Sequence, residues 1–217
     1  MRIFIITALA ACLSSVACAQ SEWERPTAKQ ESSAKQQEKV GQAKVVKESD
    51  AKYIEQGSVP EVDGKIVFSK NFNVPGKNAQ EIYDKVYGAL DSLAKTDNQI
   101  KSGIVLINKK EHIIAAHYSE WLEFSRSFIS LDRTKFNYTI IATCSDDKLN
   151  LRLERITYRY EEGRVTGFRA TAEDLIGDKN AVNKKRTKLN AGAAKFRRKT
   201  IDRKDEIFEF IDSELNK

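Results

Sequence analysis

The sequence predicts an α+β fold, with an antiparallel sheet of about five strands and helices packed on one face. An alternating segment at residues 64–76 comes first, and an amphipathic helical pattern follows it. Four more strand-like segments then succeed one another without a helix between them, and the rest of the chain has helical periodicity. The order of strand, helix, four strands and helices is typical of α+β proteins.

The first strand is expected in GKIVFSKNFNVPG, and four of its residues share one side: Ile66, Phe68, Lys70 and Phe72. Asn78 and Glu81 have the spacing of a capping box and should begin a helix. Apolar residues then recur every three or four positions, and the helix should end by Thr96.

The four later strands follow from alternation and turn residues. SGIVLIN and HIIAAHYSEWLEFS flank a turn at residues 109–111, and TKFNYTIIATC alternates so that Cys144 faces the core. In the next strand the apolar parity switches without a break, which predicts a β-bulge around Glu154 and Arg155. Lys, Arg, Thr and Asn occupy the other parity, so the second face of the sheet should be partly exposed.

Helical patterns account for the C-terminal part of the chain. Thr171 with Asp174 should start a short helix that ends at Gly177. DKNAVNKKRTKLN predicts another helix, and a last one should run from about Ala194 to Leu215 with an apolar side against the sheet.

The N-terminus has the three-part layout of a secretory signal peptide, predicted at residues 1–19 with cleavage after Ala19. Its apolar part is shorter than the roughly 20 residues that a spanning helix needs. The alternative is lipidation at Cys18. A flexible, charged tether is expected at residues 20–52, because its composition buries too little apolar surface to fold, and a single domain at residues 53–217.

Cleavage after Ala19 would leave Cys144 as the one remaining cysteine, so no intramolecular disulfide can form and stability must come from the core. Loss of Arg2 with the signal peptide changes the formal net charge from +6 to +5, so the mature protein is mildly basic. How that charge is distributed matters more for binding than its total.

Four stretches together resemble a known family: GSVPEVDGKIVFSKNFNVPGKNAQEIYDKV, SLDRTKFNYTIIATC, ITYRYEEG and RTKLNAGAAKFRRKTID. They are similar to exported proteins that carry domain of unknown function 4468, and the resemblance runs from about Tyr53 to Leu215. It implies a TBP-like fold and an exported protein. The family has no established activity, so no catalytic residue is carried over. EEGRVTGFRATAEDL is longer here than in relatives, which leaves the path of that loop open.

Catalytic and metal-binding patterns are weak. His112 and His117 lie five apart on a predicted strand, so they should point to opposite faces and not share a metal. Neither a nucleophile elbow nor a glycine-rich phosphate loop is present. We therefore expect no enzyme, no cofactor and no metal.

Basic residues are concentrated between residues 179 and 204. A candidate anion-binding flank consists of eight of them: Lys184, Lys185, Arg186, Lys188, Lys195, Arg197, Arg198 and Lys199. Such a cluster can bind acidic glycans or lipid headgroups. It can equally be the solvated side of helices whose cations pair with nearby acids.

These observations predict an exported, non-catalytic module, periplasmic or associated with the cell envelope, that binds a protein or an anionic glycan. The alternative function is an enzyme acting on an envelope polymer. Nucleic acid is not expected as a partner of an exported protein, and membrane attachment is expected only if Cys18 is lipidated.

Overall fold

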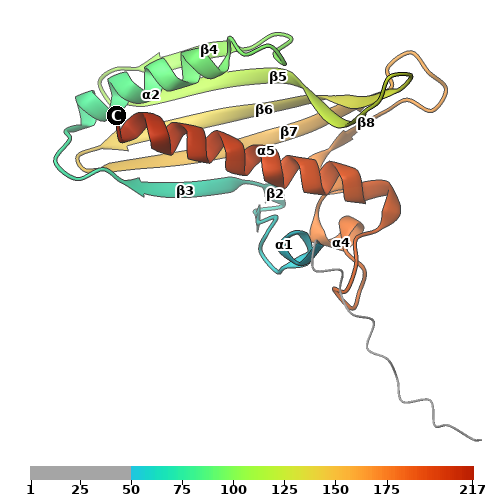
Figure 1. Cartoon of the computed structure of the whole chain (residues 1–217). Helices are drawn as coiled ribbons and strands as arrows, with labels where there is room; N and C mark the ends of the chain where they lie inside the picture. Colours follow the sequence, from blue (N-terminus) through green and yellow to red (C-terminus); the bar gives the residue numbers. More distant parts are fainter. Residues whose placement is uncertain (1–49) are drawn as a thin grey trace, which may run out of the picture. The chain divides into compact units, whose positions relative to one another are not determined.

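An antiparallel six-stranded sheet forms the centre of the structure, a computed structural model that describes residues 50–217. Five strands follow the order β3-β7-β6-β5-β4, and β8 also pairs with β7. The strands are β3 (Phe68–Asn73), β4 (Gly103–Asn108), β5 (Ile113–Arg126), β6 (Leu131–Ser145), β7 (Lys148–Tyr160) and β8 (Phe168–Thr171). Helices α2 (Ala79–Leu93) and α5 (Ala191–Leu215) lie across one face (Figure 1). This confirms the predicted α+β class.

Strand β7 has two partners along one edge. Its first half pairs with β3 and its last four residues pair with β8, while β6 occupies the other edge throughout. Between the two halves Arg155 has a φ of 58°, and the register against β6 shifts beside Tyr138. The predicted β-bulge is thus confirmed, and it lies where one edge partner replaces the other. Strand β8 was not predicted, because its four residues lie within the loop whose path the sequence left open.

Helix α2 begins at the predicted capping box. The Asn78 side chain accepts a hydrogen bond from the Glu81 backbone N–H at 3.0 Å, and the Glu81 carboxylate accepts one from the Asn78 N–H at 2.8 Å. Its apolar side, which includes Ile82, Val86 and Leu90, is fully buried. The reciprocal bonds fix where the helix starts, and the apolar side fixes how it packs on the sheet.

The core lies between the sheet and these two helices. Side chains of one parity along β5, β6 and β7 are almost completely buried there, and Cys144 is 4% exposed, as predicted for a core residue. Phe196, Ile201, Phe208 and Ile211 of α5 complete this layer. The other face of the sheet carries mostly half-exposed side chains, because no described helix covers it.

Short elements surround one end of α5. They are α1 (Ala51–Ile54), the hairpin of β1 (Glu61–Val62) and β2 (Lys65–Ile66), α3 (Ala172–Leu175) and α4 (Asp178–Ala181). The Thr171 hydroxyl caps α3 by accepting from the Asp174 N–H, as the sequence predicted. The longer helix predicted at residues 178–190 is wrong. The Asn183 side chain accepts hydrogen bonds from the backbone N–H groups of Thr187 and Lys188, which fixes a turn instead.

The predicted signal peptide, residues 1–19, and Cys18 lie outside the described residues, as does most of the predicted tether. The last residues of that tether, 50–52, belong to the folded part. Asp50 accepts two hydrogen bonds from Arg198, and Lys52 forms an ion pair with Asp202 at 2.9 Å. Asp50 and Lys52, which the sequence predicted to belong to the tether, therefore contact α5.

Candidate functional site

The residues of the predicted basic flank have different environments in the structure, and Arg197 is not at the surface. This side chain is fully buried, and its guanidinium donates hydrogen bonds to the carbonyls of Tyr53 and Ile176 and to Ser58. It also forms an ion pair with Asp178 at 2.7 Å. Burial lowers the pKa of Arg197, and the bond and charge of Asp178 oppose that effect. Arg197 therefore fastens α5 to α1 and α4 and cannot reach a ligand.

Three other cations of the flank also have partners within the described chain. Arg186 forms an ion pair with Asp178 at 2.6 Å, and Arg198 forms one with Asp50 at 2.7 Å. Lys195 donates to Asp132 at 2.8 Å and to the Tyr160 hydroxyl. These contacts match the alternative in which the cations pair with neighbouring acids.

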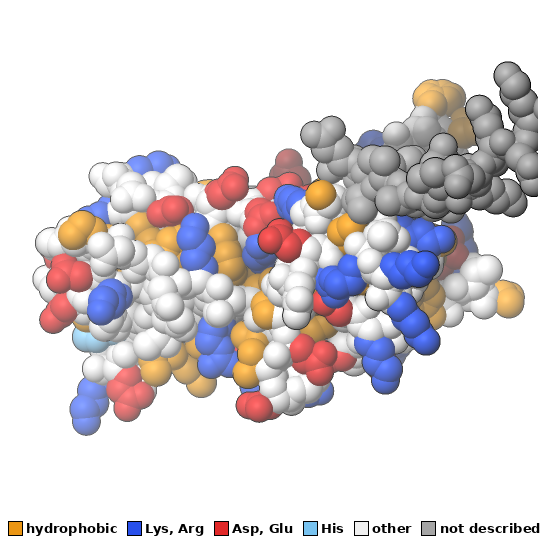
Figure 2. Space-filling view, turned by 90° about the horizontal axis from the view of Figure 1, so that it is seen from below, with side chains coloured by type: hydrophobic (Ala, Val, Ile, Leu, Met, Phe, Trp, Pro, Cys, Tyr) orange, Lys and Arg blue, Asp and Glu red, His pale blue; other side chains and the backbone are white. Residues whose placement is uncertain are grey.

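The remaining four residues of the flank are exposed and form no ion pair with another described residue: Lys184, Lys185, Lys188 and Lys199. Three of them belong to the turn between α4 and α5, whereas Lys199 lies on α5 itself. Seen from below, lysine and arginine side chains gather toward the right-hand end with acidic ones among them (Figure 2). Exposed cations are thus present at this end, but acidic side chains lie among them.

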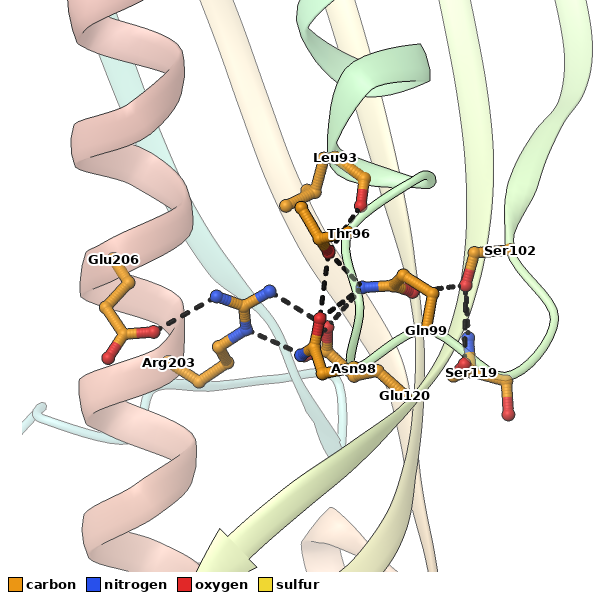
Figure 3. A network of polar contacts seen from close by, with 9 residues as sticks. All are labelled: Leu93, Thr96, Asn98, Gln99, Ser102, Ser119, Glu120, Arg203 and Glu206. Carbon is orange, nitrogen blue, oxygen red and sulfur yellow. Dashed lines mark hydrogen bonds and ion pairs between the residues drawn. The ribbon is translucent and has the colours of Figure 1, made fainter.

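A buried ion pair joins α5 to the sheet near the middle of the molecule. Glu120 of β5 is fully buried and accepts hydrogen bonds from Arg203 at 2.8 and 2.9 Å. The side chains of Asn98 and Gln99, from the connection between α2 and β4, also donate to Glu120 (Figure 3). The Trp121 N–H donates to the Asn98 carbonyl at 2.9 Å. This network therefore fixes β5 where Trp121 emerges on the opposite face.

On that open face, Trp121 begins a line of side chains that crosses four strands. Trp121 of β5 lies opposite Lys135 of β6, Lys135 lies opposite Arg159 of β7, and Arg159 lies opposite Arg169 of β8. Three cations thus occupy directly opposed positions, an arrangement that is destabilising in a sheet.

One carboxylate lies at ion-pair distance from all three of these cations. Glu162 lies 2.5 Å from Lys135, 3.6 Å from Arg159 and 3.4 Å from Arg169. Its hydrogen bond with Lys135, helped by the two arginine charges, lowers the pKa of the Glu162 carboxyl. The positive charge of the line is therefore only partly balanced.

Arg133 adds a fourth cation that has no acid at ion-pair distance among residues 50–217. Its guanidinium carbon lies 3.8 Å from the centroid of the Trp121 ring, a cation–π contact. We call the six residues Trp121, Arg133, Lys135, Arg159, Glu162 and Arg169 the Trp121 row. A hollow of about 440 Å³ lies over its middle, and Glu161 and Arg164 also line that hollow. Arginines that are held by stacking present fixed hydrogen-bond donors suited to carboxylate, sulfate or phosphate groups.

A second hollow, which we call the bulge pocket, lies at the β-bulge of β7. It measures about 470 Å³ and is lined in part by Val62, Val67 and Ile156. Two of its carboxylates are engaged, since Glu154 forms ion pairs with Arg152 and Arg155 and Glu173 accepts from the Ile66 N–H at 2.9 Å, and Asp63 also lines the pocket. The bulge pocket thus combines a largely apolar surface with several charged side chains in its lining.

The two histidines are separated by the structure, and one of them is not on the predicted strand. His112 has a φ of 53° in the turn before β5, and its ring packs edge-on against Tyr83. His117 is exposed on the open face. Within residues 50–217 no group of three or more His, Cys, Asp or Glu side chains could hold a metal ion. None of the helices described there is long and apolar enough to cross a membrane.

Sequence reasoning selected the contiguous basic run and missed the Trp121 row. The members of the row stand on four strands and one loop, so only strand register brings them together. The alternation of polar residues placed Lys135 and Arg159 on the open face but could not give their neighbours. The unpredicted β8 supplies Arg169, the last cation of the line.

A half-covered antiparallel sheet with helices on one face defines a TBP-like α+β domain. Residues 68–159 match the family model described as domain of unknown function (DUF4468) with TBP-like fold. A crystal structure of a DUF4468 family protein from Bacteroides ovatus ATCC 8483 is 41% identical, with a TM-score of 0.72 over 77% of this chain and 95% of that chain. This chain belongs to the DUF4468 family.

A TBP-like protein from Parabacteroides distasonis ATCC 8503 also resembles the chain. It is 20% identical, with a TM-score of 0.55 over 73% of this chain and 97% of that chain, so this likeness concerns the fold alone. No match is found among proteins with curated descriptions. The family relationship is established at the level of the domain and its fold.

Proposed function

We propose that this protein is an exported, non-catalytic binding module whose Trp121 row holds anionic groups of an envelope partner, either an acidic glycan or a protein. One observation carries the proposal: three cations on consecutive strands lie directly opposite one another and share a single carboxylate. Opposed like charges cost stability, and a bound anion would offset that cost. The stacked Trp121 and Arg133 add a rigid side to the same hollow.

The test compares two double variants that remove the same charge. Lys135→Gln with Arg159→Gln alters the Trp121 row, while Lys184→Gln with Lys185→Gln alters exposed cations of the predicted basic flank. Binding to oligoalginate, an acidic glycan, and to polyglutamate, an acidic polypeptide, is measured by calorimetry at low and at physiological salt. We expect the row variant to bind one of the two polymers at least tenfold more weakly, which is the scale of losing a charge-assisted hydrogen bond. The affinity of the flank variant should stay within about twofold of that of the unaltered protein.

The outcomes separate three explanations. Equal losses in both variants would mean that net charge alone attracts the polymers. A loss confined to Lys184 and Lys185 would place the anion site on the basic flank. If the unaltered protein binds neither polymer at low salt, the proposal is overturned.

An enzyme acting on an envelope polymer is a second candidate, favoured by the carboxylates around the bulge pocket. General acid catalysis by Glu173 would require a raised pKa. Burial does raise it, but the hydrogen bond from the Ile66 N–H and other contacts give a net lowering. Release of reducing ends from alginate or peptidoglycan, abolished by Glu154→Gln or Glu173→Gln, would support this candidate over the binding module.

Export is the second part of the proposal and rests on the layout of residues 1–19. Intact-mass measurement of the native protein tests it, with Gln20 expected as the first residue. An added acyl mass on a chain beginning at Cys18 would instead support lipid anchoring. A chain that retains Met1 and Arg2 would contradict export.

A further inference from the structure

Two loops at one end of the sheet carry large apolar side chains in full contact with solvent. Phe128 and Ile129, in the connection between β5 and β6, are 103% and 91% exposed, and Val165, between β7 and β8, is 106% exposed. Both connections lie at the same end of the sheet (Figure 1), and residues that flank each of them line the hollow over the Trp121 row. We call Phe128, Ile129 and Val165 the tip residues. Single exposed apolar residues are common, but side chains that project completely from two adjacent loops indicate a contact surface.

The backbone of both tips is closed by local hydrogen bonds. The Ser127 N–H donates to the Ser130 carbonyl at 2.7 Å, and the Ser130 N–H donates to the Ser127 hydroxyl. Across Val165, the Gly167 N–H donates to the Arg164 carbonyl at 3.0 Å. Each tip therefore presents its apolar side chains from a turn that hydrogen bonds close at its ends.

Positive charge surrounds the tips. Six cations come from the strands and loops of this end: Arg126, Arg133, Lys135, Arg159, Arg164 and Arg169. The acids at ion-pair distance from them within the described chain are Glu123, Glu161 and Glu162. Asp132 is also nearby, but it is bound by Lys195. This end therefore has an excess of cations next to its exposed apolar groups.

We propose that the tip residues insert into the surface of an anionic lipid bilayer, with Arg126 and Arg164, which lie outside the Trp121 row, at the level of the headgroups. Peripheral proteins bury apolar groups about 5–10 Å into the boundary between headgroups and acyl chains, and basic residues beside them are attracted to anionic lipid. A bilayer also accepts separate projecting side chains, whereas a protein partner would need a matching surface for each tip. The insertion goes beyond the proposed function, since the tip residues are not part of the Trp121 row, and it would hold the row close to envelope glycans.

The experiment measures co-sedimentation of the purified protein with vesicles. One set contains equal amounts of phosphatidylglycerol and phosphatidylcholine, and the other contains phosphatidylcholine alone. Phe128→Ser with Ile129→Ser removes the larger tip, while Val62→Ser with Val105→Ser removes two exposed apolar side chains elsewhere, at 54% and 65% exposure. All four side chains are exposed, so both variants should fold.

We expect binding to the anionic vesicles, at least tenfold weaker binding by the tip variant, and binding by the control variant within about twofold of the unaltered protein. Equal binding by the tip variant would mean that charge alone attracts the protein, which overturns insertion and leaves the proposed function standing. Binding to neither vesicle would also overturn it. Sedimentation velocity adds a further outcome: self-association that the tip variant abolishes would assign the tips to contact between copies. Loss of alginate or polyglutamate binding by the row variant alone would concern only the proposed function.

Discussion

At the scale of single residues, neighbouring cations in one basic run have different structural roles. Arg197 is fully buried among carbonyls and Asp178, Arg198 pairs with Asp50, and Lys199 is exposed. The helical turn decides this, since consecutive residues on a helix point about 100° apart. A run of cations in a sequence is therefore not a surface until the helix that carries it is docked.

Replacing Arg197 should destabilise the protein strongly. In Arg197→Met the carbonyls of Tyr53 and Ile176 lose their donor inside the fold, so we expect the free energy of unfolding to fall by about 3 kcal/mol. Lys199→Met is the matched control and should change it by less than about 0.5 kcal/mol. Urea unfolding followed by circular dichroism measures both. Similar stabilities for the two variants would contradict the structural role of Arg197.

The thiol of Cys144 should make stability fall at alkaline pH. Burial raises its pKa from 9.0 to about 12, so above pH 9 the thiol ionises in the unfolded chain while it stays protonated in the native one. The unfolded state then binds fewer protons, and the free energy of unfolding decreases with rising pH. By pH 10.5 the loss from this group should reach about 2 kcal/mol, at roughly 1.4 kcal/mol per pH unit.

Tyrosines that are buried in the native protein also ionise near pH 10 once the chain is unfolded, because burial raises their pKa in the native state, so the comparison must be made against Cys144→Ala. The difference in unfolding free energy between the two proteins, measured by urea titration from pH 7 to pH 10.5, isolates the thiol. The free energy of unfolding of the unaltered protein minus that of Cys144→Ala should fall as pH rises. A constant difference would show that the native thiol ionises as readily as the unfolded one.

At the scale of elements, the bulge in β7 lets one strand serve two partners. The parity of its apolar side chains changes there, which keeps Leu153 and Ile156 both in the core. Arg155 takes up the extra length with a φ of 58°, a conformation that costs most residues about 1–2 kcal/mol. After the bulge the edge of β7 is free to pair with β8, and β8 brings Arg169 to the Trp121 row.

A substitution by glycine should cost little stability at the bulge and more elsewhere in the strand. Arg155→Gly relieves the positive φ but loosens the unfolded chain, so we expect a change within about 0.5 kcal/mol. Arg155→Val should lose more than about 1 kcal/mol, because a β-branched residue is strained at that φ. Arg152→Gly, in the regular part of β7, should lose about 1 kcal/mol. Thermal unfolding of the three variants gives the order, and a cost for Arg155→Gly equal to that of Arg152→Gly would contradict the bulge geometry.

At the scale of the whole domain, the covered face of the sheet carries the core and the open face carries the proposed binding row. Helices α2 and α5 bury one face completely, and the ion pair of Arg203 with Glu120 ties α5 to the strand that carries Trp121. The open face, left without a helix in residues 50–217, holds the Trp121 row and ends in the exposed tips. Substitutions of the open face should therefore alter binding more than folding.

The sequence alone determined the elements whose signals are local. Alternation gave the long strands and the buried side of Cys144, the parity switch gave the bulge at Arg155, and the Asn78 and Glu81 spacing gave the start of α2. These succeed because side-chain direction in a strand and capping at a helix start depend on a few neighbouring residues.

Only the tertiary structure decided which charged side chains are buried, which form ion pairs and which lie side by side. It buried Arg197, paired Arg198 and Lys195 with acids far away in the sequence, and aligned Lys135, Arg159 and Arg169 across three strands. Register and helix docking are set by the packing of the whole core. Electrostatic neighbours at a distance in the chain follow from that packing, so no local pattern could have named them.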